Sequence, residues 1–216
     1  AFGVTPGFIY ETMGGLPAYG AVLVPGSGKQ VFDELVQYNN YAGFGCMLVD
    51  TPSSDNRVML DDNDDTVLQY TLSDADKDRF RIGVAIGIRM MFLAGATKVI
   101  IPSNENVLGL PDFDPMVGTY LTDIAQADLV GENIEFVPNR TILTSAHLQA
   151  TNKMGPKETG VVSLNHRLWA TDGTEVPNVY VMDSSIFPTS VGANPMQSLY
   201  SIAKIFSERL LNGFAS

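Results

Sequence analysis

The chain has 216 residues, of which 45% are hydrophobic. This is enough apolar material to bury a core in one or two domains, so the sequence indicates a globular protein rather than a disordered one. Its 24 acidic and 13 basic residues give a formal charge of −11. Such a charge repels phosphate backbones and anionic lipid, so no nucleic-acid partner is expected.

Cysteine and histidine are scarce, which limits the chemistry available. Cys46 is the only cysteine, and only His147 and His166 stand beside it as histidines, so neither a disulfide within the chain nor a Cys/His zinc site is expected. Cys46 lies in an apolar run and is predicted to be an inert buried thiol. The apolar run 84–96 is interrupted by Arg89 and too short to span a bilayer, so no transmembrane segment is expected. The compartment is left open.

The first half of the chain contains predicted strands and one long helix. Residues 43–49 (GFGCMLV) form an apolar strand, and the short runs 57–60 and 66–71 flank the acidic turn 61–65 (DDNDD), which predicts a hairpin. A helix is expected from an N-cap at Ser73 to near Gly95, because acidic residues occupy its first turn. Its buried face repeats every three or four residues and comprises Phe80, Val84, Ile88, Met91 and Phe92.

The second half mixes further short strands and helices. The β-branched run 98–102 (KVIIP) predicts a strand, and Asp114 with Pro115 predicts a helix that continues to about Ala127. Residues 178–183 (NVYVMD) predict a buried strand, and residues 195–212 a terminal helix. Antiparallel hairpins followed by a strand and its packing helix predict an α+β fold.

Two segments carry residues suited to chemistry. The segment 145–155 (SAHLQATNKMG) places His147 before small and polar residues. The segment 179–203 contains a strand that ends in Asp183 and then Gly-Ala-Asn-Pro at a helix start. A strand end that leads to a helix N-terminus presents backbone N–H groups to a ring carbonyl or a phosphate, so the second segment predicts a binding site.

These segments resemble the glucose-methanol-choline oxidoreductases, and more narrowly the long-chain alcohol oxidases and cholesterol oxidases. The resemblance rests on the His147 segment, Gly160-Val161-Val162, residues 178–183 and the GANP segment, in that order. It covers nearly the whole chain and is strongest in about the last 70 residues. It implies FAD as cofactor and the oxidation of a primary or secondary, apolar alcohol to its carbonyl by hydride transfer to flavin.

The resemblance also implies roles for individual residues. His147 matches the family's general base, and Asn194 matches a position where a second histidine or an asparagine faces the flavin ring. Histidine can accept the hydroxyl proton near neutral pH, and an amide can donate to the alkoxide-like oxygen. Asp183 and Ser184 match the stretch beside the flavin pyrophosphate and ribityl chain. Asn194 and the backbone of Pro195 and Met196 match the stretch beside the ring itself.

Each of these residues also has a purely structural interpretation. Asn194 before Pro195 is a common way to begin a helix, and Asp183 can act as a buried cap acceptor. His166, which lies outside both segments, is predicted to be a surface or packing residue. The sequence also departs from the family, because residues 148–151 (LQAT) stand where glycines are usual and Ser198 where threonine is common.

The chain lacks the Gly-x-Gly-x-x-Gly fingerprint that binds the adenosine half of FAD, and the glycines of residues 25–30 (PGSGKQ) are predicted to form a turn. We therefore expect residues 1–145 to form most of a substrate-binding lobe with an antiparallel sheet. Residues 146–216 are expected to complete a Rossmann-like FAD-binding lobe. The expected partner is an N-terminal FAD-binding polypeptide, or the missing half of the same chain. Two alternatives remain at this point: a flavin-containing lyase on the same scaffold and a non-catalytic subunit.

Overall fold

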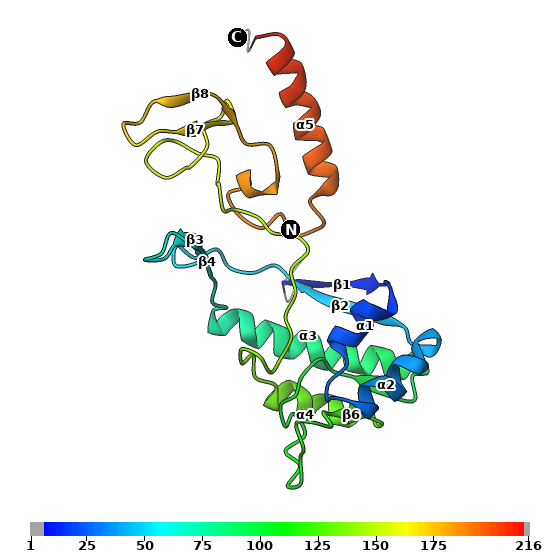
Figure 1. Ribbon diagram of the computed structural model, residues 1–216. Coiled ribbons are helices and arrows are strands. Elements are labelled where there is room, and N and C mark those ends of the chain that lie inside the picture. The colour runs from blue at the N-terminus through cyan, green and yellow to red at the C-terminus, as the bar shows by residue number, and fades with distance from the viewer. Residues whose placement is uncertain (1–6, 214–216) are drawn as a thin grey trace. The chain divides into compact units, whose positions relative to one another are not determined.

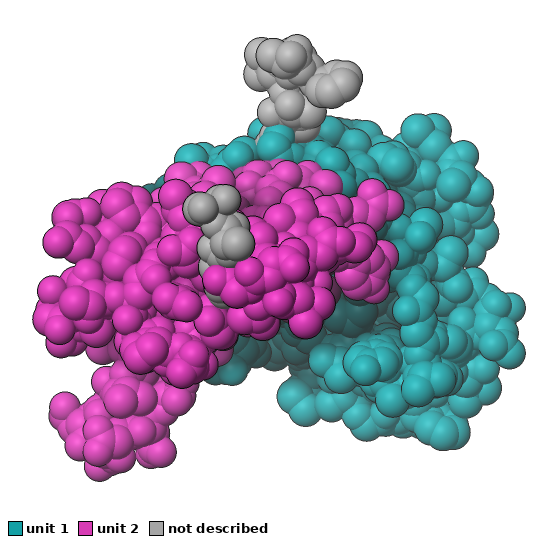
Figure 2. Space-filling model, turned by 90° about the horizontal axis from the view of Figure 1, so that it is seen from above, with its two compact units in different colours: residues 1–48, 74–144 teal, residues 49–73, 145–216 magenta. Residues whose placement is uncertain are grey.

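The computed structural model describes residues 7–213, and their contacts divide into two compact units (Figure 2). Unit 1 takes the residues up to Leu48 and Asp74–Thr144, and unit 2 takes Val49–Ser73 and the residues from Ser145 onward. The two units are defined by contacts within the chain. The expected lobes, residues 1–145 and 146–216, are defined by the substrate or cofactor that they would bind, so they stay a prediction.

Both units combine helices with short antiparallel strands (Figure 1), which confirms the expected α+β class. Unit 1 contains β1 (Phe8–Met13), α1 (Pro17–Leu23), α2 (Lys29–Val36), β2 (Gly43–Leu48), α3 (Asp74–Leu93), β5 (Val99–Ile100), β6 (Tyr120–Leu121) and α4 (Gln126–Asn133). Unit 2 contains β3 (Arg57–Leu60), β4 (Thr66–Gln69), β7 (Arg167–Trp169), β8 (Glu175–Tyr180) and α5 (Met196–Leu211). Each described sheet has two strands, in the pairs β1–β2, β3–β4, β5–β6 and β7–β8.

Helix α3 organises unit 1, where it packs against the β1–β2 ribbon and against α4 (Figure 1). Asp74 and Asp76 in its first turn suit the positive end of the helix. Its glycines allow the ribbon to approach closely, because a Cβ at Gly83 would lie 2.5 Å from the Sγ of Cys46. The buried apolar core is made of Ile88, Val99, Ile101, Val107, Leu121, Ala127, Val130 and Ile134.

Most of the expected elements of unit 1 are confirmed, but one helix was wrong. The strand beginning at Gly43, the helix beginning at Asp74 and the strand within residues 98–102 are present. The helix expected from Asp114 to Ala127 is absent, and α4 begins only at Gln126. Asp114 starts a turn instead, since its Oδ1 accepts the Met116 N–H at 2.9 Å and Gly118 ends that turn at a φ of +78°.

Burial also determines the state of the single cysteine. Cys46 lies on β2 and is half-buried against α3. Removal from water raises the pKa of the Cys46 thiol to about 11, because burial disfavours the charged thiolate. The thiol is therefore protonated at neutral pH, as expected for an inert cysteine.

In unit 2 the predicted hairpin and terminal helix are confirmed as β3–β4 and α5. The expected buried strand at residues 178–183 was wrong in extent and in burial. Strand β8 ends at Tyr180, and Asn178 and Val179 are exposed. The physical reason is that β8 pairs with β7 alone among the described strands, so much of its surface has no covering layer.

The small core of unit 2 joins α5 to the strand pair. The Phe206 ring is buried, and its centroid lies 4.7 Å from that of His166 and 5.5 Å from that of Tyr180. His166 is itself buried, so it is a packing residue rather than a surface residue. Leu199 and Ile202 of α5 are half-buried, whereas five other large apolar side chains of this helix are exposed: Met196, Tyr200, Ile205, Leu210 and Leu211.

Residues 7–213 contain no candidate for a membrane-spanning helix or a metal centre. No helix there combines the length and apolarity needed to cross a membrane. No group of three or more His, Cys, Asp or Glu side chains in the same range is arranged to hold a metal ion.

The environment of His166 predicts a pH-dependent stability. Burial lowers the pKa of this imidazole below its ordinary value of 6.5, and the Arg209 charge lowers it further, against a bond to the Val181 carbonyl that raises it. Below about pH 6.5 the His166 imidazole binds a proton more readily in the unfolded chain than in the folded chain. The free energy of unfolding therefore decreases as the pH is lowered. We expect the free energy of unfolding to fall more steeply below that pH in the wild type than in His166→Asn. Asparagine tolerates the backbone φ of +62° at this position. Equal slopes for the two proteins would contradict the assignment.

Candidate functional site

The His147 segment is an irregular loop that runs beside the chain following β8. His147 is half-buried, and three residues later the backbone turns at Ala150, whose φ is +70°. Beyond the turn, the Asn152 N–H donates to the Ser185 carbonyl at 3.0 Å and the Met154 N–H to the Ile186 carbonyl at 2.8 Å. These backbone bonds align the loop with residues 185–186.

Asp183 and Ser184 lie just after β8, at the start of a short 3-10 helix, Ser184–Ile186. The Asp183 carboxylate accepts the Ser185 N–H at 2.7 Å and therefore caps this turn from an exposed position. The Ser184 hydroxyl donates to the Leu148 carbonyl at 2.6 Å. Two of the predicted cofactor-binding residues thus belong to the segment that lies directly against the His147 loop.

Asn194, Pro195 and Met196 form the entry to α5. The N-cap is Pro195, which is buried, and no side chain caps the first turn. Asn194 is exposed and does not cap the helix, so the structural interpretation of this residue is not supported. The first turn of α5 also contains no acidic residue. Its backbone N–H groups and helix dipole therefore favour a negative charge or a carbonyl oxygen placed there.

A glutamine joins the His147 loop to the loop that precedes Asn194. The Val191 N–H donates to the Gln149 Oε1 at 3.1 Å, and the Gln149 Nε2 donates to the His147 carbonyl at 3.3 Å. Asn152 adds a side-chain bond from its Nδ2 to the Ser185 Oγ at 3.0 Å. Sequence reasoning missed Gln149 and Asn152 as parts of the site. For Gln149 the available signal was a polar residue within positions 148–151, where the family usually has glycines.

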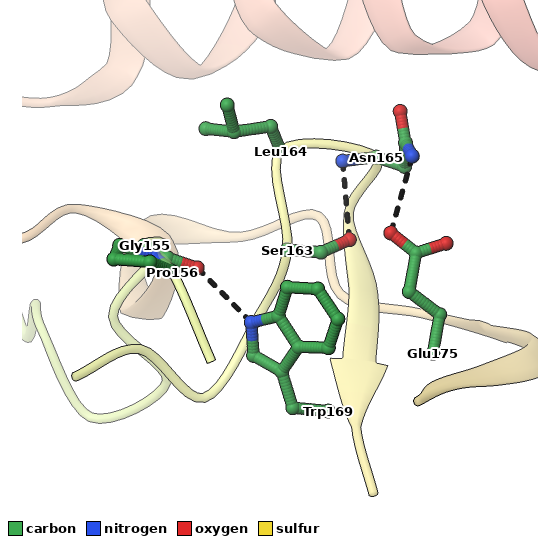
Figure 3. Close-up of a pocket in the computed structure, with 7 residues that line it drawn as sticks. All are labelled: Gly155, Pro156, Ser163, Leu164, Asn165, Trp169 and Glu175. Atoms are coloured by element: carbon green, nitrogen blue, oxygen red, sulfur yellow. Dashed lines mark hydrogen bonds between the residues drawn. The ribbon is translucent and has the colours of Figure 1, made fainter. Parts of the chain in front are cut away.

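A separate depression lies among the residues between the two segments (Figure 3). It has a volume of about 340 Å³ and is lined by Gly155, Pro156, Ser163, Leu164, Asn165, Trp169 and Glu175. The Trp169 indole N–H donates to the Gly155 carbonyl at 3.0 Å. The pKa of the Glu175 carboxyl is lowered, first by a hydrogen bond from Ser163 and then by Asn165 and Arg167. None of the predicted site residues lines this depression, so its shape does not identify the reaction site.

Comparison with known proteins places this arrangement in a family. A GMC oxidoreductase family model matches residues 52–203, which is more than half of the chain and includes His147, Asp183 and Asn194. An uncharacterised GMC-type oxidoreductase of Mycobacterium tuberculosis is 26% identical over 207 residues, covering 94% of this chain and 29% of that protein. A long-chain-alcohol oxidase of Arabidopsis thaliana is 25% identical over 189 residues, covering 86% of this chain and 23% of that protein.

Among solved structures, pyridoxine 4-oxidase from Mesorbium loti aligns with 78% of this chain and 29% of its own, with 18% identity and a TM-score of 0.45. The chain therefore spans less than a third of the length of these relatives. The match of the family model over residues 52–203 establishes that this chain belongs to the GMC oxidoreductase family.

Proposed function

We propose that this chain is the part of an FAD-dependent alcohol oxidase or dehydrogenase that carries the catalytic base. The enzyme oxidises a primary or secondary, apolar alcohol to its carbonyl. The observation that carries the proposal is the direct hydrogen bonding between the His147 loop and the chain that leads from Asp183 to Asn194. Family membership and the long-chain-alcohol oxidases among the relatives support the reaction class.

In this proposal His147 takes the proton of the alcohol hydroxyl as the carbon is oxidised. An imidazole suits this role because it exchanges protons near neutral pH. The exposed amide of Asn194 donates to the same oxygen as negative charge develops on it. The bonds from Ser184 and Gln149 hold the two segments together, so that base and donor act on one substrate.

The residues after β8 fit the FAD that the family implies. FAD, when bound, supplies the oxidant that removes the hydride from the alcohol carbon. The uncapped first turn of α5, free of acidic residues, suits the electron-rich edge of such a ring, and the residues that would hold it are Asn194, Pro195 and Met196. Asp183 and Ser184, at the end of β8, would lie along the pyrophosphate and ribityl chain.

The proposed enzyme requires a further FAD-binding polypeptide, encoded separately or as another part of the same chain. The relatives are more than three times as long as the matched region, which covers 29% and 23% of them. Exposure of α5 supports the same conclusion, because Tyr200 and Ile205 are 68% and 57% exposed. A helix with such an apolar surface needs a covering layer.

Replacing His147 with Ala tests the base. In the flavin-containing assembly we expect flavin reduction by alcohol to slow by ~10²–10⁴-fold, the usual cost of losing a general base, with flavin content near normal. Anaerobic stopped-flow absorbance measures the rate. His166→Asn, which changes the other histidine, is the control and should keep the wild-type rate. Unchanged kinetics in His147→Ala would remove this residue from the mechanism.

Two substitutions at Asn194 test the role of its amide. A carboxylate would repel both the developing alkoxide and the electron-rich ring, so Asn194→Asp should reduce flavin more slowly than Asn194→Ala. The matched control is Asn178→Asp, because that residue is exposed on β8 and receives the same added charge. Equal rates in the two Asn194 variants would show that charge at this position does not matter for the reaction.

The exposed surface of α5 allows a test of the expected partner. The chain expressed alone should bind no flavin, and co-expression with the N-terminal FAD-binding polypeptide should give a yellow complex. Ile205→Asp should weaken that complex because it places a charge in the covered apolar surface. Ser207→Asp, also on an exposed part of α5, is the control. A stoichiometric flavin spectrum from residues 1–216 alone would contradict the need for a partner.

A further inference from the structure

We propose that Gln149 is a positioning residue that fixes the His147 loop against the loop carrying Asn194. We call the pair of hydrogen bonds made by the Gln149 side chain the tether. The inference rests on the proposed function, since it assigns the tether a consequence for catalysis. It goes beyond that function because it assigns a role to a residue that is neither the proposed base nor a proposed cofactor contact.

Both ends of the Gln149 amide are engaged. Its Nε2 donates to the carbonyl of His147, two residues earlier, at 3.3 Å. Its Oε1 accepts the N–H of Val191, which is 42 residues later, at 3.1 Å. A primary amide of this length supplies a donor and an acceptor at once, whereas a carboxylate supplies only acceptors and an aliphatic side chain neither.

The backbone around Gln149 is held in an uncommon conformation. Ala150 has a φ of +70°, a backbone conformation that is unfavourable for a non-glycine residue and persists only where neighbouring contacts enforce it. Those contacts are present on both sides of the turn. The Ser184 hydroxyl donates to the Leu148 carbonyl at 2.6 Å, and the Ser185 carbonyl accepts the Asn152 N–H at 3.0 Å.

The Gln149 side chain also connects the loop before α5 to the His147 segment. Residues 188–195 form neither helix nor strand, and Gly192 within them has a φ of +74°. The Gly192 N–H bonds locally to the Ser190 Oγ at 3.4 Å, whereas the Val191 bond reaches the His147 segment. Since Asn194 follows three residues after Val191, the tether limits how far the donor can move from the base.

Three variants of the flavin-containing assembly test the tether: Gln149→Ala, Gln149→Glu and Gln30→Ala. Gln149→Ala removes both bonds, whereas Gln149→Glu keeps the acceptor for the Val191 N–H. Gln30→Ala is the matched control, because it removes a glutamine bond to a distant backbone carbonyl, that of Val117 at 2.7 Å, within unit 1. The first readout is amide hydrogen exchange at Val191, which does not depend on activity.

We expect the Val191 amide to exchange faster in Gln149→Ala and to stay protected in Gln149→Glu and Gln30→Ala. The second readout is the limiting rate of flavin reduction at saturating alcohol. It should fall about 10–100-fold in Gln149→Ala with little change in apparent alcohol affinity, since positioning acts on the chemical step. Gln149→Glu should retain most of the rate, and Gln30→Ala should match the wild type.

Unchanged Val191 exchange in Gln149→Ala would overturn the tether. Faster exchange with an unchanged limiting rate would overturn its role in positioning. Failure of the proposed function can be distinguished from failure of the tether, because in that case no alcohol reduces the flavin of the wild-type assembly. In that case the catalytic consequence fails as well, while the exchange measurement still decides whether the tether exists.

Discussion

The hydrogen bonds between the His147 loop and the chain that follows β8 are the constraint on which the candidate site depends. They join residues that lie 32 to 42 positions apart, through backbone bonds at Asn152 and Met154 and side-chain bonds at Ser184 and Gln149. Side-chain bonds of this kind each contribute only about 1 kcal/mol to stability. Their value lies in geometry, because they hold the segments that carry His147 and Asn194, the proposed base and donor, beside each other although neither segment is a regular element.

Unit 2, which contains these segments, exposes large apolar side chains along α5 and the β3–β4 hairpin. Phe206 is the one buried residue among the described residues of α5, and both strands of the β3–β4 hairpin are exposed. Large exposed apolar surfaces mark interfaces or a missing covering layer. Together with coverage of less than a third of the relatives' length, this agrees with the proposal that a further polypeptide covers the exposed surface.

The sequence predicted elements whose signal is local. The acidic turn 61–65 indicated its hairpin, and the periodicity from Phe80 to Phe92 indicated α3. The prediction of a helix at Asp114 was wrong because Asp-Pro begins turns as well as helices. Here the segment forms a single turn that ends at Gly118. The apolar run at residues 178–183 also predicted burial, but apolar character reveals which residues need covering and not whether the covering surface lies in the same chain.

The candidate site divides in the same way. His147, Asp183 and Asn194 stand in motifs that short stretches of sequence reveal. Gln149 makes its bond 42 residues away, and no local pattern carries such a contact. Its neighbour Ala150 adopts a φ of +70° that would ordinarily predict glycine, so the residue type alone conceals the turn. Long-range polar contacts of this kind become visible only when the fold brings the segments together.

The most direct test of the account follows the absorption spectrum of the purified native assembly during anaerobic addition of a long-chain alcohol. The account predicts a second polypeptide, flavin absorption bands, and bleaching of those bands as alcohol is added. An assembly without flavin absorption, or a flavin whose bands do not change with any primary or secondary alcohol, would contradict the assignment of this chain to an alcohol-oxidising flavoenzyme.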